Sequence, residues 1–296
     1  MDHPPHEQPK EAVGLDETFV ISGHWQIESL KGHILKSQCE RNTKPQSADA
    51  KSCDDEPGAG SPCLFCRYRK ELADLPQWPE MIFASNFLEL YHIPSGAVIK
   101  FDALDALKGV DTKKDWVKVE ASEEWKAARK DVSFINNTIN PFDWTFSTDY
   151  AGSTESRSGM SISPTNERIN MDRLKIHERI LFYEEMTLFE DELADHGCAC
   201  LSLKFRAMPS GWFALLRYYL RVDHVLVRVI DTRLRWEQQS PRKVLREQTK
   251  RQGRLADLTD QTVRALFFDP GKLDALVPSL SLVEERFEKI ELNGSK

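Results

Sequence analysis

The chain has 296 residues, of which 40% are hydrophobic and 29% charged, and its formal net charge is −7. This composition is typical of a globular protein with a sizeable core. The net charge excludes a broad attraction to nucleic acid or anionic lipid, and no run approaches the roughly 18 apolar residues of a membrane span. We therefore expect neither a nucleic-acid partner nor a membrane association.

The N-terminus, residues 1–15, is polar and contains prolines, so we expect a flexible segment before a single domain over residues 16–292. It lacks the basic and apolar regions of a secretory signal. We expect a cytoplasmic protein, with a nuclear location also compatible, whose six cysteines are mostly reduced. Residues 38–61 are rich in Ser, Asp, Gly and Pro, and we interpret residues 38–75 as a disordered insertion in the domain.

The insertion contains Cys63 and Cys66 at C-x-x-C spacing, with Cys39 and Cys53 upstream. A zinc ribbon needs two close cysteine pairs, so this is half of such a motif. We interpret the cysteines as incidental and predict no metal and no cofactor. Redox or zinc chemistry is the alternative.

The next segments predict a hairpin and short helices. Pro94, Ser95 and Gly96 separate two apolar runs, which indicates a β-hairpin. Residues 102–110 and 122–131 have the pattern of short helices, and residues 170–183 carry a weaker helical pattern.

Aromatic side chains gather in "NPFDWTFSTDYAG", residues 140–152, which includes Trp144 and Tyr150. Two interpretations have equal weight. The rings can form the core side of a strand, or they can line a groove for a peptide, because Trp and Tyr combine a large rigid surface with a polar atom.

Acidic side chains are concentrated in "FYEEMTLFEDELADHG", residues 182–197. On a strand these carboxylates would alternate between faces and could not converge on one ion, and they would face Lys204 and Arg206 on the next strand. On a helix, Glu192 and His196 would be spaced as two metal ligands. We favour a solvated strand. A metal-dependent hydrolase that uses the carboxylates of residues 184–196 is the alternative.

The strongest β pattern follows in residues 200–208, where Leu201, Leu203, Phe205 and Ala207 alternate with polar residues. Two further apolar runs flank Asp223 and His224, which predicts a tight hairpin with a two-residue turn.

Residues 233–254 are basic and predict a solvated helix or a contact with an acidic protein, with nucleic acid as the alternative because of Trp236. The fold class is therefore α+β, mainly antiparallel β-sheets with flanking helices in a single compact domain.

No nucleophile elbow, Walker loop or dinucleotide fingerprint is found in the sequence.

The segments "PEMIF", "FDALDAL", "NPFDWTFSTDYAG", "FYEEMTLFEDELADHG" and "SLKFRAMPSGWFALLRYYLRVDHVLVRVIDTRL" resemble, in this order, the TIPRL (TOR signalling pathway regulator-like) family. The resemblance implies a non-enzymatic regulator that binds the catalytic subunit of type 2A-like Ser/Thr phosphatases. It would hold the phosphatase's C-terminal tail in a cleft, oppose the active holoenzyme, and act in TOR and stress signalling. We expect it to be a monomer when free.

The resemblance also implies cleft residues. Matching motifs place Asp105, Ile169, Val229 and Asp231 in the cleft. Arg228 and Arg233 flank the last two residues and are candidate partners for a terminal carboxylate, which arginine binds with two hydrogen bonds. Strand alternation puts Arg233 on the face of Val229 and Asp231, and Arg228 on the other. Trp144 and Tyr150 are the candidate aromatic residues.

Overall fold

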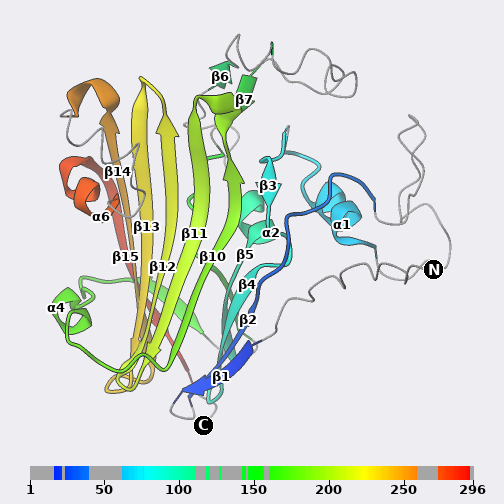
Figure 1. Ribbon diagram of the computed structural model, residues 1–296. Coiled ribbons are helices and arrows are strands. Elements are labelled where there is room, and N and C mark those ends of the chain that lie inside the picture. The colour runs from blue at the N-terminus through cyan, green and yellow to red at the C-terminus, as the bar shows by residue number, and fades with distance from the viewer. Residues whose placement is uncertain are drawn as a thin grey trace, which may run out of the picture.

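Two antiparallel sheets face each other in the computed structural model, which describes residues 17–21, 24–39, 62–75, 77–110, 118–120, 127, 142–144, 146–156, 160–258 and 273–293 (Figure 1). The smaller sheet has the order β1-β2-β4-β5-β8. Its strands are β1 (Glu17–Ile21), β2 (Trp25–Leu30), β4 (Phe87–His92), β5 (Ala97–Asp102) and β8 (Ser153–Ser156). The hairpin predicted around Ser95 is confirmed by the pairing of β4 with β5.

The larger sheet has the order β3-β10-β11-β12-β13-β14-β15-β9. Its strands in chain order are β3 (Met81–Ile82), β9 (Ser161–Pro164), β10 (Phe182–Asp191), β11 (Gly197–Met208), β12 (Gly211–Val222), β13 (Leu226–Glu237), β14 (Lys243–Arg254) and β15 (Ser281–Glu291). The predicted alternation is confirmed on β11, where Leu201, Leu203, Phe205 and Ala207 are all buried.

Short elements complete the fold, and the α+β class is confirmed. They are the strands β6 (Lys118–Glu120) and β7 (Phe142–Trp144), the helices α1 (Leu64–Glu71), α2 (Ala103–Lys108), α4 (Met171–Leu174) and α6 (Leu273–Leu276), and the 3-10 turns η3 (Leu193–Asp195), η4 (Leu255–Asp257) and η6 (Val277–Ser279). In the part of the chain described, no helix is both long and apolar enough to span a membrane.

Helix α2 begins where β5 ends because Asp102 caps it. The Asp102 carboxylate accepts a hydrogen bond from the backbone N–H of Asp105 at 2.8 Å, which satisfies an amide that has no partner within the helix. The apolar side chains of α2 are buried in the core between the sheets. This arrangement leaves the side chain of Asp105 at the edge of the core.

The core is formed by apolar side chains from both sheets. Trp25 of β2 lies between Trp212 of β12 and Trp236 of β13, with ring centroids 5.2 and 6.1 Å from its own. All three indoles are fully buried. Because Trp236 lies in this core, it is not a stacking surface for nucleic acid bases.

A buried histidine in this core makes folding stability depend on pH. Burial and, to a smaller extent, the charge of the neighbouring His24 lower the pKa of His92 from 6.5 to about 4. Between these values unfolding takes up a proton, so stability that is present above pH 6.5 is lost as the pH falls toward 4, by about 1.4 kcal/mol per pH unit. Urea unfolding of wild type and His92→Gln at several pH values checks this. The wild type should lose more stability on acidification, and equal losses would contradict the role of His92.

The predicted disordered insertion over residues 38–75 is wrong in its C-terminal part, because α1 lies there. Tyr68 of α1 is 2% exposed and donates a hydrogen bond to the backbone oxygen of Ala84 at 3.3 Å. The packing of Tyr68 against the core therefore orders α1, although the apolar pattern of this helix is short and follows a polar stretch. Residues 40–61, the N-terminal segment 1–15 and most of the predicted helix 122–131 lie outside the described residues.

Three local predictions in the second half of the chain need correction. Within 170–183 the helix covers only α4, and Phe182 already begins β10. The basic stretch 233–254 forms the end of β13 and all of β14, because cross-strand pairing overrides its helical pattern. The turn between β12 and β13 has three residues, since Val222 pairs with Leu226. His224 takes a positive φ of 60° in this turn, which suits a three-residue loop.

Candidate functional site

Strand alternation divides β13 between the core and an outer face, which is the face of the large sheet turned away from the small sheet. Ile230 and Leu234 belong to the core between the sheets. Val229, Asp231 and Arg233 lie on the outer face, as the sequence predicted. Helix α6 lies on this outer side in Figure 1.

Asp231 is the centre of an ion-pair network on the outer face. It is 1% exposed, and its two carboxylate oxygens accept hydrogen bonds from Arg217 at 2.6 and 2.8 Å. Arg233 donates a third hydrogen bond at 2.7 Å. Arg217 also contacts Asp274 of α6 at 2.7 Å. We call Arg217, Asp231, Arg233 and Asp274 the Asp231 cluster.

The cluster keeps Arg217 charged. Burial alone lowers the pKa of Arg217, but the hydrogen bonds and charges of Asp231 and Asp274 outweigh it and raise the pKa above its ordinary value. The two carboxylates of the cluster differ in exposure: Asp231 is buried, whereas the Asp274 side chain is 79% exposed. Arg217 therefore binds one internal carboxylate and one that solvent or a ligand can replace.

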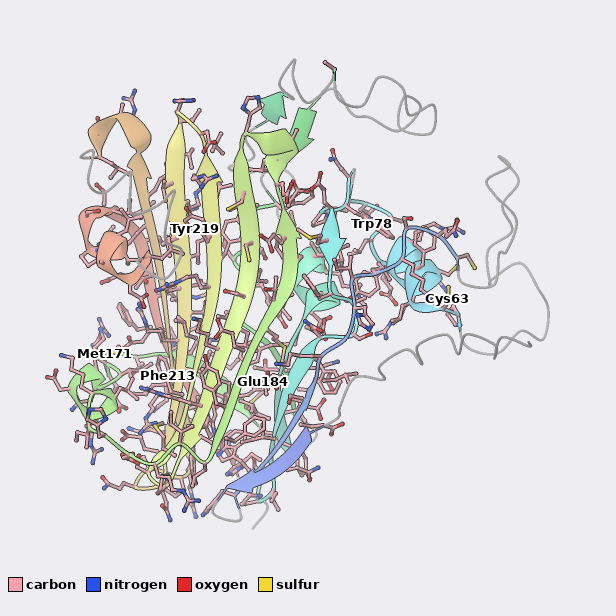
Figure 2. All side chains as sticks on the ribbon, in the orientation of Figure 1. Cys63, Trp78, Met171, Glu184, Phe213 and Tyr219 are labelled. Carbon is pink, nitrogen blue, oxygen red and sulfur yellow. The ribbon has the colours of Figure 1, made fainter. Side chains whose placement is uncertain are left out.

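Val229 lies beneath the α6–η6 segment, residues 273–280. It forms a second hydrophobic cluster with Val227, Leu276 and Leu280, with Tyr219 packed against it. Figure 2 shows Tyr219 on the large sheet. Arg251, opposite Val229 on β14, donates a hydrogen bond to the backbone oxygen of Leu280 at 2.9 Å. The α6–η6 segment thus covers the part of the outer face that the family resemblance assigns to a cleft.

Ile169 approaches the same face from the chain between β9 and α4. Its side chain is buried, and its backbone N–H donates to the Glu247 carboxylate at 2.5 Å. Glu247 pairs with Arg233 across β13 and β14. The structure therefore brings Ile169, Val229, Asp231 and Arg233 to one face of the large sheet.

Asp105 and Tyr150 form a separate group beside the small sheet. Ser153 of β8 donates a hydrogen bond to the Asp105 carboxylate. The Tyr150 hydroxyl is 3.2 Å from the Ser153 hydroxyl and donates to the backbone oxygen of Lys100 at 3.1 Å. Burial raises the pKa of Tyr150, so the phenol stays protonated at neutral pH. Asp105 and Tyr150 thus share one hydrogen-bond network.

We expect Asp105→Asn and Ser153→Ala each to lower the free energy of unfolding by about 1–2 kcal/mol, because both remove one charge-assisted hydrogen bond. The double variant should lose less than the two single losses added together, since the same bond is removed only once. Urea unfolding of the three variants measures this, with Asp149→Asn as a control at an exposed carboxylate. Additive losses would show that the two side chains act independently.

The remaining candidate residues lie elsewhere. Arg228 points into the core side of the large sheet, where it donates to Ser147 at 3.1 Å and Gln252 at 2.8 Å. These hydrogen bonds satisfy the Arg228 side chain within the fold, and its position on the core side separates it from the Asp231 cluster. The backbone of Trp144 is in β7, but its side chain lies outside the described residues. Sequence reasoning missed Arg217 and Asp274.

The acidic stretch 182–197 forms the strand β10 as far as Asp191 and the turn η3 after it, and its described carboxylates serve different partners. Glu184 is buried where β10 approaches β2 (Figure 2), and it contacts Lys31 at 2.7 Å and accepts from Ser29 at 3.1 Å. Glu185 lies on the opposite side and pairs with Lys204 at 2.9 Å, as predicted. Asp191 accepts backbone hydrogen bonds from Leu193 and Glu80. These carboxylates face different ways, so the described part of the stretch offers no convergent ligand set for a hydrolytic metal.

Comparisons with known proteins agree with the order of segments seen in the sequence. Residues 81–259 match the TIP41-like family. The TIP41-like protein of Caenorhabditis elegans is 40% identical over 287 residues, which cover 95% of this chain and 92% of that protein. The TIP41-like protein of Homo sapiens is 36% identical over 275 residues, covering 92% and 90%. The type 2A phosphatase activator TIP41 of Saccharomyces cerevisiae is 36% identical over 194 residues, covering 61% and 54%.

Proposed function

Since the chain belongs to the TIP41-like family, we propose that it is a non-enzymatic regulator that binds the catalytic subunit of type 2A-like Ser/Thr phosphatases. The observation that carries this proposal is the name of the budding-yeast relative, a type 2A phosphatase activator. The matched residues include β10 to β14 and therefore the framework of the outer face.

The proposed binding site for the phosphatase's C-terminal tail is the outer face around the Asp231 cluster. A peptide that ends in a carboxylate needs an arginine whose position is fixed before binding, because a preorganised arginine loses less entropy. Arg217 is fixed by Asp231, and its remaining nitrogen contacts the exposed Asp274. The tail carboxylate would replace Asp274 at Arg217, and α6 would move aside.

The proposed effect of binding is to oppose assembly of the active holoenzyme, in TOR and stress signalling. The name of the yeast relative suggests the opposite sign, activation. Measuring holoenzyme activity with and without the protein therefore tests the sign separately from binding. A rise in activity would contradict opposition while leaving binding intact.

The binding test uses a purified type 2A catalytic subunit, intact and with its C-terminal tail removed. The protein should co-elute with the intact subunit and bind the truncated one at least about tenfold more weakly, a difference of about 1.4 kcal/mol. No co-elution with either form would overturn the proposed function. Equal affinity for both would overturn the role of the tail.

Asp274→Ala should bind a synthetic tail peptide about two- to fivefold more tightly, because Asp274 no longer competes for Arg217. Stability should change by less than about 1 kcal/mol, since the side chain is exposed. Glu155→Ala, at an exposed carboxylate of β8, changes the net charge equally and is the matched control. Fluorescence anisotropy measures the affinities. An equal gain in affinity in the control would show that the change in net charge, and not competition for Arg217, causes the effect.

A further inference from the structure

Three cysteines meet at the N-terminus of α1, and one of them, Cys39, comes from the chain after β2. The Sγ atoms of Cys39, Cys63 and Cys66 all lie within 4.8 Å of one another. The Sγ atoms of Cys63 and Cys39 are 3.9 Å apart. Figure 2 shows Cys63 at the end of α1, on the opposite side of the molecule from α6. This thiol cluster is thus separate from the outer face proposed for phosphatase binding.

The spacing of the sulfurs matches a tetrahedral metal site. Zinc–sulfur bonds of about 2.3 Å in a tetrahedral site place neighbouring sulfurs about 3.8 Å apart. The 3.9 Å separation between Cys63 and Cys39 is close to this value. Small rotations of the side chains can therefore bring the three sulfurs to one ion without moving the backbone.

Helix α1 supplies two of the three sulfurs from its first turn. Cys63 is the N-cap of α1 and Cys66 lies in the first turn, so the two side chains are one helical turn apart. The N–H groups at a helix N-terminus stabilise negative charge. The helix carries Arg67, Arg69 and Lys70 but no acidic residue in its first turn. The charge of this helix therefore complements the net negative charge of a zinc ion that is bound by three thiolates.

The cluster is held by packing and is largely shielded from solvent. Cys66 is 1% exposed and Cys39 is 8% exposed, and Phe65 packs against both. The Phe65 ring in turn contacts Trp78, at 5.7 Å between centroids. An apolar shell of this kind fixes the ligand side chains.

We propose that Cys39, Cys63 and Cys66 bind one Zn²⁺ ion through three thiolates, with water at the fourth position. Thiolates are soft ligands that select zinc over magnesium or calcium. Each thiol loses its proton to solvent as the ion binds, and no sulfur changes its oxidation state.

Zinc at this site would connect the chain after β2 to α1. Helix α1 packs into the core through Tyr68 and pairs with α2 through Glu71 and Lys108, which are 2.6 Å apart. Helix α2 carries Asp105. The ion would therefore stabilise α1 and its contact with α2, because metal binding to the folded state adds to folding stability.

The test loads the full chain with zinc under reducing conditions, removes unbound metal by gel filtration, and measures zinc by elemental analysis. About one ion per chain is expected in the wild type, and less than about a tenth of that in Cys39→Ser and Cys63→Ser. The matched control is Cys198→Ser/Cys200→Ser, which removes two thiols of β11 and should keep the metal. Loss of zinc in the control as well, or no zinc in the wild type, would overturn the proposal.

Two further measurements separate the site from a folding defect of the variants. Cobalt in place of zinc should give thiolate-to-metal charge-transfer absorption in wild type and control but not in Cys63→Ser. Adding zinc to the metal-free wild type should slow amide hydrogen exchange in residues 64–71, with no change in Cys63→Ser. Mass spectrometry of the protein isolated without reductant checks for a Cys39–Cys63 disulfide. A disulfide that persists and prevents zinc loading would overturn the proposal and assign the cluster to redox chemistry.

Discussion

Asp231→Asn is expected to lower the free energy of unfolding by about 3–5 kcal/mol, because it removes one partner of a buried ion pair and leaves the others without compensation. Asp231 is 1% exposed and accepts three hydrogen bonds from Arg217 and Arg233. Asparagine keeps the size of the side chain but can accept at only one oxygen. Urea unfolding of the variant and the wild type measures the loss.

A triple variant provides the control for this prediction. Arg217→Met, Asp231→Leu and Arg233→Met together remove Asp231 and both of its arginine partners, so most of the stability should return. If the triple variant is as unstable as Asp231→Asn, the loss comes from shape and not from charge.

This prediction also changes how phosphatase binding should be tested. Asp231→Asn is a natural variant for a binding test, because the resemblance places Asp231 in the cleft. The structure shows that the same change removes a structural ion pair. A loss of binding in Asp231→Asn therefore has two causes that cannot be separated. Asp274, with its exposed side chain, is the better position.

Trp25→Ala should lower the free energy of unfolding by about 3–5 kcal/mol, because it opens a cavity between the two sheets. The Trp25 ring is fully buried and contacts Trp212 and Trp236 of the large sheet and His92 of the small sheet. The loss of these contacts affects both layers at once. Denaturant unfolding followed by tryptophan fluorescence measures it.

Tyr91→Ala is the control for Trp25→Ala. Tyr91 lies on β4, which pairs with β2, but its side chain is 37% exposed. Removing it should cost much less, because little buried surface is lost. A loss of the same size in both variants would mean that the small sheet is sensitive to any change and that the contact between the sheets is not the cause.

Local patterns in the sequence were sufficient for much of the fold. The alternation at Leu201, Leu203 and Phe205 predicted β11 correctly, because side chains of a strand point alternately to its two faces. The helix predicted over residues 102–110 is α2. The faces of Val229 and Arg228 also followed from alternation.

The position of Asp231 in its network could not be predicted in the same way. A two-residue turn at Asp223 and His224 would pair Asp231 with Leu216. The three-residue turn shifts the register by one residue, so Asp231 pairs with Arg217 instead. A single residue in a turn thus decides whether a buried carboxylate faces an apolar side chain or an arginine.

The sequence by itself determined the antiparallel α+β class, the main strands and the membership in the TIP41-like family, because these depend on short-range periodicity and on the order of segments. Only the tertiary structure decided that α6 covers Val229, that Asp274 reaches Arg217, and that Cys39 joins Cys63 and Cys66. These contacts join residues far apart in the chain. Their geometry is set by the packing of the two sheets and of α1, which no local pattern encodes.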